Sequence, residues 1–424
     1  MKNFYLQPKV CTALKGYTRQ QCVSDIIAGI IVAVIALPLS IALALASGVE
    51  PACGIYTAVA AGFIVSLFGG SRVQIAGPTA AFATVVAGIV AAEGMDGLFI
   101  ATVMAGVLLI VMGVCKVGTL IKYVPHTITV GFTAGIAVTI LLGQVKDFFG
   151  LTYAAGVRPV ETIEKMEANI AALGTFRWEA LLVGAVCLAV LVIYPRFEKR
   201  VPPSLIAVVV GTLLVQCIPA LNDGVSTIGE LYTIPRGLPQ VNFAGMDLSP
   251  ARWLALLPNA VTIALLAGIE SLLSCVVADG MVDDTHNPHA ELTAQGLANV
   301  ASVLFGGIPA TGAIARTAAN VKNGGRTPVA GMVHALVLFA VLMFLMPYAG
   351  LIPMPTIAAI LFVVAYNMSE WRAFVKIVQT RRVTDILVVV LTFALTVIFD
   401  LVVAIVVGLV LAYAFVLFKK LQKK

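Results

Sequence analysis

Two ionisable residues lie inside otherwise apolar stretches of this sequence. Glu270 falls in the middle of the run 263–277, and Arg316 falls about one turn into a short segment that begins at Thr311. Ionisable side chains are costly inside a bilayer and mark substrate or ion pathways. Glu270 can accept a proton or supply an oxygen ligand to Na⁺, and Ser274, one helical turn later, shares its face. Arg316 can add positive potential for an anion or neutralise Glu270 in an ion pair, and both interpretations remain open.

A repeated motif places two matching breaks in the chain. Residues 66–70 (Ser-Leu-Phe-Gly-Gly) recur as residues 303–307 (Val-Leu-Phe-Gly-Gly), and each copy ends an apolar run. A few residues of extended type follow each copy, and a short helix then begins. We expect Gly77-Pro78 and Thr311-Gly312 to open these helices, because Pro is well suited to a first helical position.

Two helices that start at mid-membrane and face each other can bind an anion between them. Each start leaves free backbone N–H groups and a partial positive charge, so two facing starts form an anion site without a cationic side chain. The extended residues 72–76 and 308–310 can pair with each other and satisfy backbone groups that lipid cannot. The alternative is that the glycines only allow close helix packing.

The elements that position these residues must be membrane helices. Of the 424 residues, 60% are hydrophobic and only 11% are charged, whereas soluble domains carry about 25% charged residues. The mean hydropathy is +1.02. A span needs about 20 apolar residues, and we expect an all-α polytopic membrane protein with fourteen segments. These are 23–46, 52–68, 78–91, 97–114, 124–145, 178–195, 203–218, 252–277, 291–305, 311–321, 327–347, 353–367, 383–399 and 401–418.

The positions of the two motif copies give the organisation of the chain. Seven segments separate them, and because seven is odd, the second half must lie inverted in the membrane. Inverted repeats with short, interrupted segments at matching positions are typical of secondary transporters. We expect an N-terminal cytoplasmic segment (1–22), a first seven-segment repeat (23–218), an external connection (219–251), a second repeat (252–418) and a basic cytoplasmic tail (419–424).

The basic residues agree with this topology. Most of the 27 Lys and Arg residues fall on the inner side when both termini are cytoplasmic, as the positive-inside rule predicts. The net charge of +6 therefore does not indicate a nucleic-acid partner. The first apolar run, 26–46, is too long for the core of a signal peptide, so we expect no targeting segment to be removed. We expect a multi-pass protein of the cell membrane, here a bacterial inner membrane.

Other reactive residue types give weaker signals. The seven cysteines are scattered without a Cys-x-x-Cys pair, which favours packing over metal or disulfide chemistry. Asn287-Pro288 is typical of a helix cap followed by Pro at the first helical position. Around it lies a polar cluster that could form a metal site, although we expect its acidic residues to be solvated. The cluster comprises Asp279, Asp283, Asp284, His286, His289 and Glu291.

Enzyme chemistry has no candidate constellation in this sequence. It contains no His-Glu-x-x-His, no phosphate-binding Walker loop and no serine-centred elbow. We therefore expect no enzymatic activity and no cofactor other than a bound H⁺ or Na⁺.

Further motifs follow one another along nearly the whole chain. They are residues 25–29 with 36–38 in the first segment, 69–72 with 77–79 in the third, 124–125 with 131–135 in the fifth, 270–274 with 279–280 in the eighth, 311–313 with 316–317 in the tenth, and 384–385, 392–393 and 400–401 in the last two. Each motif is weak by itself. Together and in this order they resemble the SulP anion permeases (solute carrier family 26).

The resemblance implies a fold and a mechanism. The fold has two inverted seven-helix repeats, divided into a core (helices 1–4 and 8–11) and a gate (helices 5–7 and 12–14). Alternating access is implied by an elevator-like movement of the core against the gate, and the assembly implied is a homodimer. Glu270 matches a carboxylate associated with proton or Na⁺ coupling in bacterial members, and Ser274 accompanies it. The anion-binding residues implied are Leu39, Ser40, Gly77, Pro78, Thr79, Ala80, Thr311, Gly312, Ala313 and Arg316.

Two features depart from the family pattern. Many members carry Gln after the first-helix proline, where this chain has Leu39, and this loss of a polar ligand leaves the substrate class open. Members also usually carry a cytoplasmic STAS domain after the last helix, and the resemblance here is to the membrane domain without a STAS domain.

These features predict a secondary active transporter of a small anion, such as bicarbonate, sulfate or a dicarboxylate, coupled to H⁺ or Na⁺. One alternative is an uncoupled anion channel or exchanger on the same fold. Another is a nucleobase permease, which should carry carboxylates in both the eighth and tenth segments, whereas the tenth here has Arg316.

Overall fold

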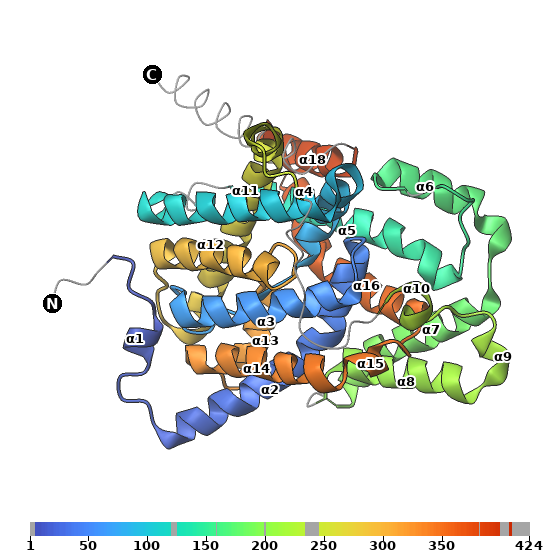
Figure 1. The fold of residues 1–424 in the computed structure, drawn as a ribbon, viewed down its shortest axis with the longest axis horizontal. Coiled ribbons are helices and arrows are strands. Elements are labelled where there is room, and N and C mark those ends of the chain that lie inside the picture. The colour runs from blue at the N-terminus through green and yellow to red at the C-terminus, as the bar shows by residue number, and fades with distance from the viewer. Residues whose placement is uncertain are drawn as a thin grey trace.

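The apolar segments fold into helices that pack lengthwise against one another (Figure 1). Among the described residues, the only regular non-helical element is a pair of two-residue strands. The computed structural model describes residues 5–119, 125–157, 159–198, 201–233, 246–380, 382–398 and 407–408.

The first half of the chain begins with a capped helix. The Thr18 side chain and Gln21 form a capping box at the start of α2, and Pro51 occupies the first turn of α3, where its missing N–H is not needed. The elements are α1 (Val10–Ala13), α2 (Arg19–Ala46), α3 (Pro51–Phe68), β1 (Ala76–Gly77), α4 (Ala80–Val114), α5 (His126–Phe149), α6 (Thr162–Ala171), η2 (Leu173–Thr175), α7 (Trp178–Ile193), η3 (Tyr194–Arg196), α8 (Pro203–Cys217), α9 (Pro219–Asn222) and α10 (Ile228–Leu231).

The second half contains the predicted cap at Asn287. Its side chain accepts hydrogen bonds from the backbone N–H groups of His289 and Ala290, and Pro288 follows it at the helix start, as predicted. The elements are α11 (Pro250–Val282), α12 (Pro288–Leu304), β2 (Thr311–Gly312), α13 (Ile314–Lys322), α14 (Pro328–Phe344), α15 (Met346–Ala349), α16 (Met354–Met368), α17 (Trp371–Gln379) and α18 (Val383–Ile398).

The all-α, multi-pass character is confirmed. Within the described residues, six helical stretches are long and apolar enough to cross a membrane, and three shorter apolar helices, α8, α14 and α18, accompany them. The third and fourth predicted segments correspond to two helical stretches of α4 that meet at a kink at Gly94, where φ is +71° and the backbone is not helical. Glycine adopts this left-handed conformation without a Cβ clash. The fourteenth predicted segment, 401–418, lies almost wholly outside the described residues.

The two chain breaks meet, as predicted, but the paired residues differ from those expected. β1 and β2 are antiparallel, with Ala76 opposite Gly312 and Gly77 opposite Thr311. The backbone groups expected to open the helices are therefore used in the strand pair. The helices consequently begin two or three residues later than predicted, at Ala80 and Ile314.

Helices from the two halves interleave around the strand pair. α4 packs against α11 and α12, while α3 packs against α12 and α14 (Figure 1). A second group of contacts joins α5 to α16 and α18, and α7 to α8 and α16. Gly106 and Gly296 allow α4 and α12 to approach closely, because a Cβ on either glycine would collide with the backbone of the other helix.

The cysteines are all free thiols, and their surroundings differ. Cys53, Cys187 and Cys275 are buried, as expected of packing residues. Cys11 and Cys115 are exposed, as is Cys217, so the packing interpretation does not hold for these.

Candidate functional site

The strand pair brings most of the predicted site residues to one cavity of about 300 Å³. The starts of α4 and α13 form adjacent walls, and α2 and α11 contribute one side chain each from the predicted set. The predicted residues that line the cavity are Leu39, Pro78, Thr79, Ala80, Glu270, Gly312, Ala313 and Arg316.

Four predicted residues lie behind this lining. Gly77 belongs to the strand pair, and the hydroxyl oxygen of Thr311 lies 2.8 Å from that of Ser271. Ser40 is fully buried in α2, and its hydroxyl has no hydrogen-bond partner within the described part of the chain. The Ser274 hydroxyl donates to Oε1 of Gln74 at 2.8 Å instead of facing the cavity.

Neither helix start is capped by a side chain. Thr79 is the residue before α4, but its hydroxyl makes no hydrogen bond to the helix, and Ala313, before α13, has no polar side chain. The first N–H groups of a helix have no partner within the helix itself. Both starts therefore direct donors and the positive end of a helix dipole toward the cavity.

Arg316 places a buried cation at the same point. Its side chain is 1% exposed, and Nη2 donates to the Pro78 carbonyl at 2.7 Å. Nε and Nη1 have no hydrogen-bond partner among the described residues. A Cβ at position 77 would collide with Nη1, so the glycine in β1 leaves the room that the guanidinium occupies. Buried donors without partners are rare in proteins, and they indicate that a ligand or solvent completes the site.

Glu270 is held by a hydroxyl rather than by a cation. Its Oε2 accepts a hydrogen bond of 2.9 Å from the Thr79 hydroxyl. Glu270 and Arg316 both line the cavity, yet they form no salt bridge with each other. The alternative of a structural Glu270–Arg316 ion pair is therefore not the arrangement found, because Glu270 is held by the Thr79 hydroxyl and Arg316 by the Pro78 carbonyl.

A buried hydrogen-bond network supports the strand pair from behind. The Gln74 amide donates to the Ser271 carbonyl at 3.1 Å and to Glu291 at 3.4 Å. The Ser271 hydroxyl in turn accepts from the backbone N–H of Gly312 at 3.0 Å. This network was not predicted, since a single Gln in an extended stretch has no distinctive sequence signal.

Glu291 corrects the prediction that the acidic cluster is solvated. It is fully buried and accepts a 2.9 Å hydrogen bond from the backbone N–H of Gly70. Gln295, one turn later on α12, donates to it at 3.0 Å. Glu291 is shielded from solvent because α12 packs directly against the end of the first motif copy.

Three further members of that cluster, Asp279, Asp284 and His286, are paired. The His286 ring lies 2.7 Å from Asp279, and Lys9 binds Asp284 at 3.0 Å. The pKa of Asp284 is below its ordinary value. Burial alone would raise this pKa, but the lowering effect of its neighbours is larger. It comes from hydrogen bonds with Lys9 and the Thr285 backbone and from the charges of Lys9 and Arg72. Within the described ranges, no three His, Cys, Asp or Glu residues gather as a metal site would require.

The far wall of the cavity was not predicted as a site. It is formed by Thr133 of α5, by Val364, Asn367 and Met368 of α16, and by Glu370 just after α16. Thr133 lies inside a motif that the sequence analysis used only for the family resemblance. The α16 residues belong to an apolar run without any motif, so only tertiary packing identifies them.

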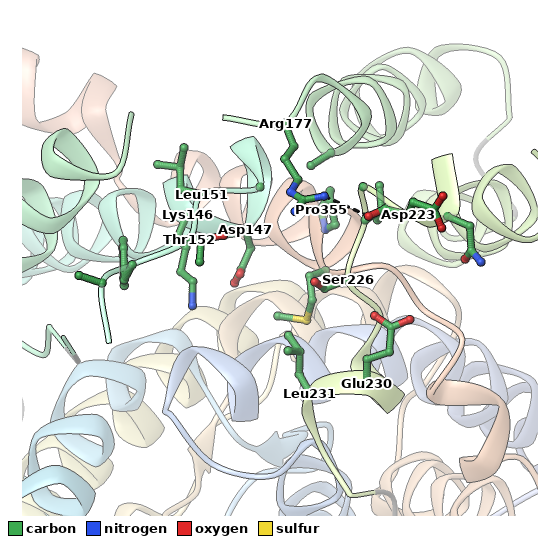
Figure 2. A pocket seen from close by; sticks show the side chains of 18 of the residues that line it. Lys146, Asp147, Leu151, Thr152, Arg177, Asp223, Ser226, Glu230, Leu231 and Pro355 are labelled. Atoms are coloured by element: carbon green, nitrogen blue, oxygen red, sulfur yellow. Dashed lines mark hydrogen bonds between the residues drawn. The ribbon is translucent and has the colours of Figure 1, made fainter. Parts of the chain in front are cut away.

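A larger cavity of about 500 Å³ lies elsewhere, between the end of α5 and the starts of α7 and α16. In Figure 2, Lys146 and Asp147 lie on one side of it, and Arg177 with Asp223 on the other. Arg177 donates to the Asp223 carbonyl at 3.0 Å. Glu230 adds a further carboxylate, so its charges are mixed and favour neither sign of ligand. It contains no predicted site residue, so the smaller cavity is the candidate site.

Comparison with known proteins matches most of this chain to one family. The profile of the Sulfate permease family matches residues 23–392. YvdB of Bacillus subtilis, provisionally described as a sulfate transporter, is 45% identical over 406 residues, covering 95% of this chain and 74% of YvdB. The bicarbonate transporter BicA of Picosynechococcus sp. is 33% identical over 402 residues, covering 92% of this chain and 69% of BicA.

Solved structures show the same fold. The transmembrane domain of a cyanobacterial bicarbonate transporter BicA superposes with a TM-score of 0.78 at 29% identity, covering 93% of this chain and 98% of that one. The overall structure of SLC26A9 superposes with a TM-score of 0.87 at 19% identity, covering 98% of this chain and 68% of that chain. At that identity the second match concerns the fold alone.

Proposed function

This chain belongs to the Sulfate permease family, and we propose that it is a secondary active transporter of a small anion. Bicarbonate, sulfate and small dicarboxylates are the substrates we propose. The observation that carries the proposal is the meeting of two uncapped helix starts with the unpartnered Nε and Nη1 of Arg316 in one cavity. The names of two matched relatives, which are described as a sulfate and a bicarbonate transporter, support the substrate class.

The physical reason is that these donors favour negative charge. Backbone N–H groups and a guanidinium form charge-assisted hydrogen bonds to oxyanions. Charges interact more strongly in a buried site than in water, so a small anion gains from both helix starts and from Arg316 at once. Leu39 and Ala80 supply no polar atoms from their side chains, so at these two positions the cavity selects anions by size and shape.

We further propose that Glu270 couples anion movement to H⁺ or Na⁺, with Ser274 supporting the same stretch of α11. Glu270 lies in the same cavity as the proposed anion, and the Thr79 hydroxyl contacts it at 2.9 Å. A negatively charged carboxylate repels an anion at close range in a buried site. A bound proton or Na⁺ removes that repulsion, so each ligand increases the affinity for the other.

Alternating access is proposed to occur between the two helix groups. We assign α2–α4 and α11–α14 to the core, and α5, α7, α8, α16 and α18 to the gate. The cavity takes Glu270 and Arg316 from the first group, and Thr133 and Asn367 from the second. An elevator-like displacement of the core would therefore carry the anion past the gate wall. The two inverted repeats (23–218 and 252–418), cytoplasmic termini, an inner-membrane location and a homodimer belong to the same proposal.

The proposal is tested by uptake of labelled sulfate and bicarbonate into proteoliposomes containing the full chain. Arg316→Gln removes a charged donor worth about 1.5–3 kcal/mol, so we expect the apparent anion affinity to fall roughly 10- to 100-fold. Lys322→Gln, an exposed residue on the same helix, is the matched control and should leave uptake unchanged. Unchanged affinity in Arg316→Gln, in protein that remains folded, would contradict the proposed site. Uptake that ignores both H⁺ and Na⁺ gradients would favour an uncoupled exchanger on the same fold.

A further inference from the structure

Helix α17 presents three different faces along its nine residues. The first face packs on the protein. Phe374 and Ile377 are partly buried, and the Phe374 ring lies 5.6 Å from that of Phe393 in α18. Contacts with α5 and α18 hold this face in place. The helix is therefore docked along one side only.

The second face is apolar and exposed. Trp371, Val375 and Val378 follow one another at helical spacing and remain 45%, 42% and 39% exposed within the described part of the chain. Large apolar side chains aligned on one exposed face indicate contact with an apolar phase or a partner.

The third face is basic. Arg372 and Lys376 lie one turn apart and are exposed, and Arg382 follows just after the helix. The Arg372 guanidinium lies 5.4 Å above the Trp371 ring, which brings the basic and apolar faces together. α17 itself contains no acidic residue, and none of these three cations forms a salt bridge with any described residue.

We propose that α17 lies in the plane of the membrane surface and binds the headgroups of anionic phospholipids. The helix connects the apolar helices α16 and α18, so both of its ends are attached to the membrane domain. Trp and Val on one face can enter the acyl-chain boundary, while Arg and Lys on the adjacent face reach the phosphates. Trp is also the residue type that prefers this interface.

Charge decides between lipid and a second copy of this chain as the occupant. In a two-fold symmetric contact through α17, the same helix of the second copy would face it, so that Arg372 and Lys376 would meet like charges. Anionic headgroups instead complement all three cations. A lipid surface is therefore the occupant that this helix fits.

The position of α17 also links it to the cavity. Glu370, the residue before the helix, adopts a left-handed conformation with φ of +44°, and its carbonyl accepts from the N–H of Ala373 and Phe374. Glu370 also lines the cavity of the proposed transport site. The lipid-binding helix thus begins one residue away from the cavity wall.

The single tryptophan of α17 allows a direct test. Trp178→Phe and Trp253→Phe together leave Trp371 as the only tryptophan of the three. This variant is reconstituted in nanodiscs containing brominated phosphatidylglycerol or, separately, brominated phosphatidylcholine. We expect Trp371 fluorescence to be quenched more strongly by the brominated phosphatidylglycerol. Each cation is attracted to an anionic surface, so we expect a preference for phosphatidylglycerol over phosphatidylcholine of roughly fivefold per basic residue.

Removing basic residues from α17 tests whether they cause the headgroup preference. Adding Arg372→Gln and Lys376→Gln should reduce the headgroup preference to the part that Arg382 contributes, while quenching itself persists. The matched control, Lys15→Gln with Arg19→Gln, removes the same charge from exposed positions elsewhere and should retain the preference. High salt should weaken the preference in the parent variant, which tests the charges without altering the fold.

Two results would overturn the inference. Equal quenching by both brominated lipids at low salt would mean that the basic face does not select anionic headgroups. Absence of quenching by either lipid would mean that something other than lipid, such as a second copy of the chain, covers the apolar face. Both results concern α17 alone and leave the proposed transport function untouched.

Discussion

The Thr79 hydroxyl donates a 2.9 Å hydrogen bond to Glu270 instead of capping the helix that it precedes. The same contact therefore does two things. It holds the carboxylate of α11 beside the start of α4, and it leaves the first N–H groups of α4 without a side-chain acceptor. A site for negative charge and a group that can take up a cation are in this way placed side by side.

Glu270→Gln should separate anion binding from coupling. The amide keeps the size of the side chain and can still accept from Thr79, but it cannot gain or lose a proton at ordinary pH. We expect accumulation of anion under an imposed H⁺ or Na⁺ gradient to fall to the level seen without a gradient. Exchange of internal for external anion should persist.

The measurement is uptake in proteoliposomes with each gradient imposed separately. Glu167→Gln, an exposed carboxylate on α6, is the control and should leave gradient-driven accumulation unchanged. A Glu270→Gln protein that still accumulates anion as the unmodified protein does would remove Glu270 from the coupling mechanism.

Gly77→Ala should disturb the site through the backbone. The added Cβ would collide with Nη1 of Arg316, so either the guanidinium or the strand pair must move. Overpacking of this kind typically costs about 1–3 kcal/mol of folding free energy. We expect a lower thermal unfolding midpoint and a weaker apparent affinity for the anion.

Gly88→Ala on α4 provides the comparison, because nothing lies within 4 Å of a Cβ built there. It should leave anion affinity unchanged, and the greater helix propensity of Ala favours equal or slightly greater stability. If the two alanine variants bind anion equally well, the close approach of Gly77 to Arg316 has no functional importance.

Glu291→Gln should lower stability more than it lowers anion affinity. Glu291 accepts hydrogen bonds from Gly70, Gln74 and Gln295. An amide in its place has one acceptor oxygen fewer, and its own N–H group would face at least one of these N–H donors. Buried donors left without acceptors cost about 1–3 kcal/mol each. Thermal unfolding in detergent, with and without the anion, measures both quantities.

In Glu291→Gln, the increase in unfolding temperature caused by the anion should resemble that of the unmodified protein, since Glu291 does not line the cavity. A variant with normal stability would show that the network behind the strand pair contributes little. The exposed Glu167→Gln change again serves as the control for loss of a carboxylate.

The lowered pKa of Asp284 predicts that the stability of the protein depends on pH. Its pKa is lower in the folded protein than its ordinary value, so folding favours the ionised form. This stabilisation is fully present above the ordinary pKa of about 3.9 and is lost as the pH falls through the folded pKa. The Lys9–Asp284 pair is partly exposed, which limits its contribution to about 0.5–1 kcal/mol.

We therefore expect Asp284→Asn to lower the unfolding midpoint slightly near neutral pH. The difference from the unmodified protein should disappear once the pH is below the folded pKa of Asp284. Asp283→Asn, at the neighbouring position, is the comparison and should change the midpoint less. A difference that grows as the pH falls would have the wrong sign and would contradict the assignment.

The membrane class, the pair of chain breaks and the residues that meet there could be predicted from the amino-acid sequence. Apolar runs interrupted at two copies of Phe-Gly-Gly can be recognised locally, because the cost of unpaired backbone in lipid restricts what such breaks can form. For the same reason the pairing of the two breaks could be predicted, although its register, Ala76 opposite Gly312, could not.

Which side chains face the cavity and which support it depends on tertiary packing. Thr79 contacts Glu270, whereas Ser274, on the same helix as Glu270, contacts Gln74. Glu291 is buried although its neighbours in sequence pair near the surface, and Asn367 reaches the cavity from an apolar run. These outcomes depend on how α4, α11, α12 and α16 pack against one another. Burial and hydrogen-bond partners arise from contacts between segments far apart in the chain, so local residue patterns do not contain them.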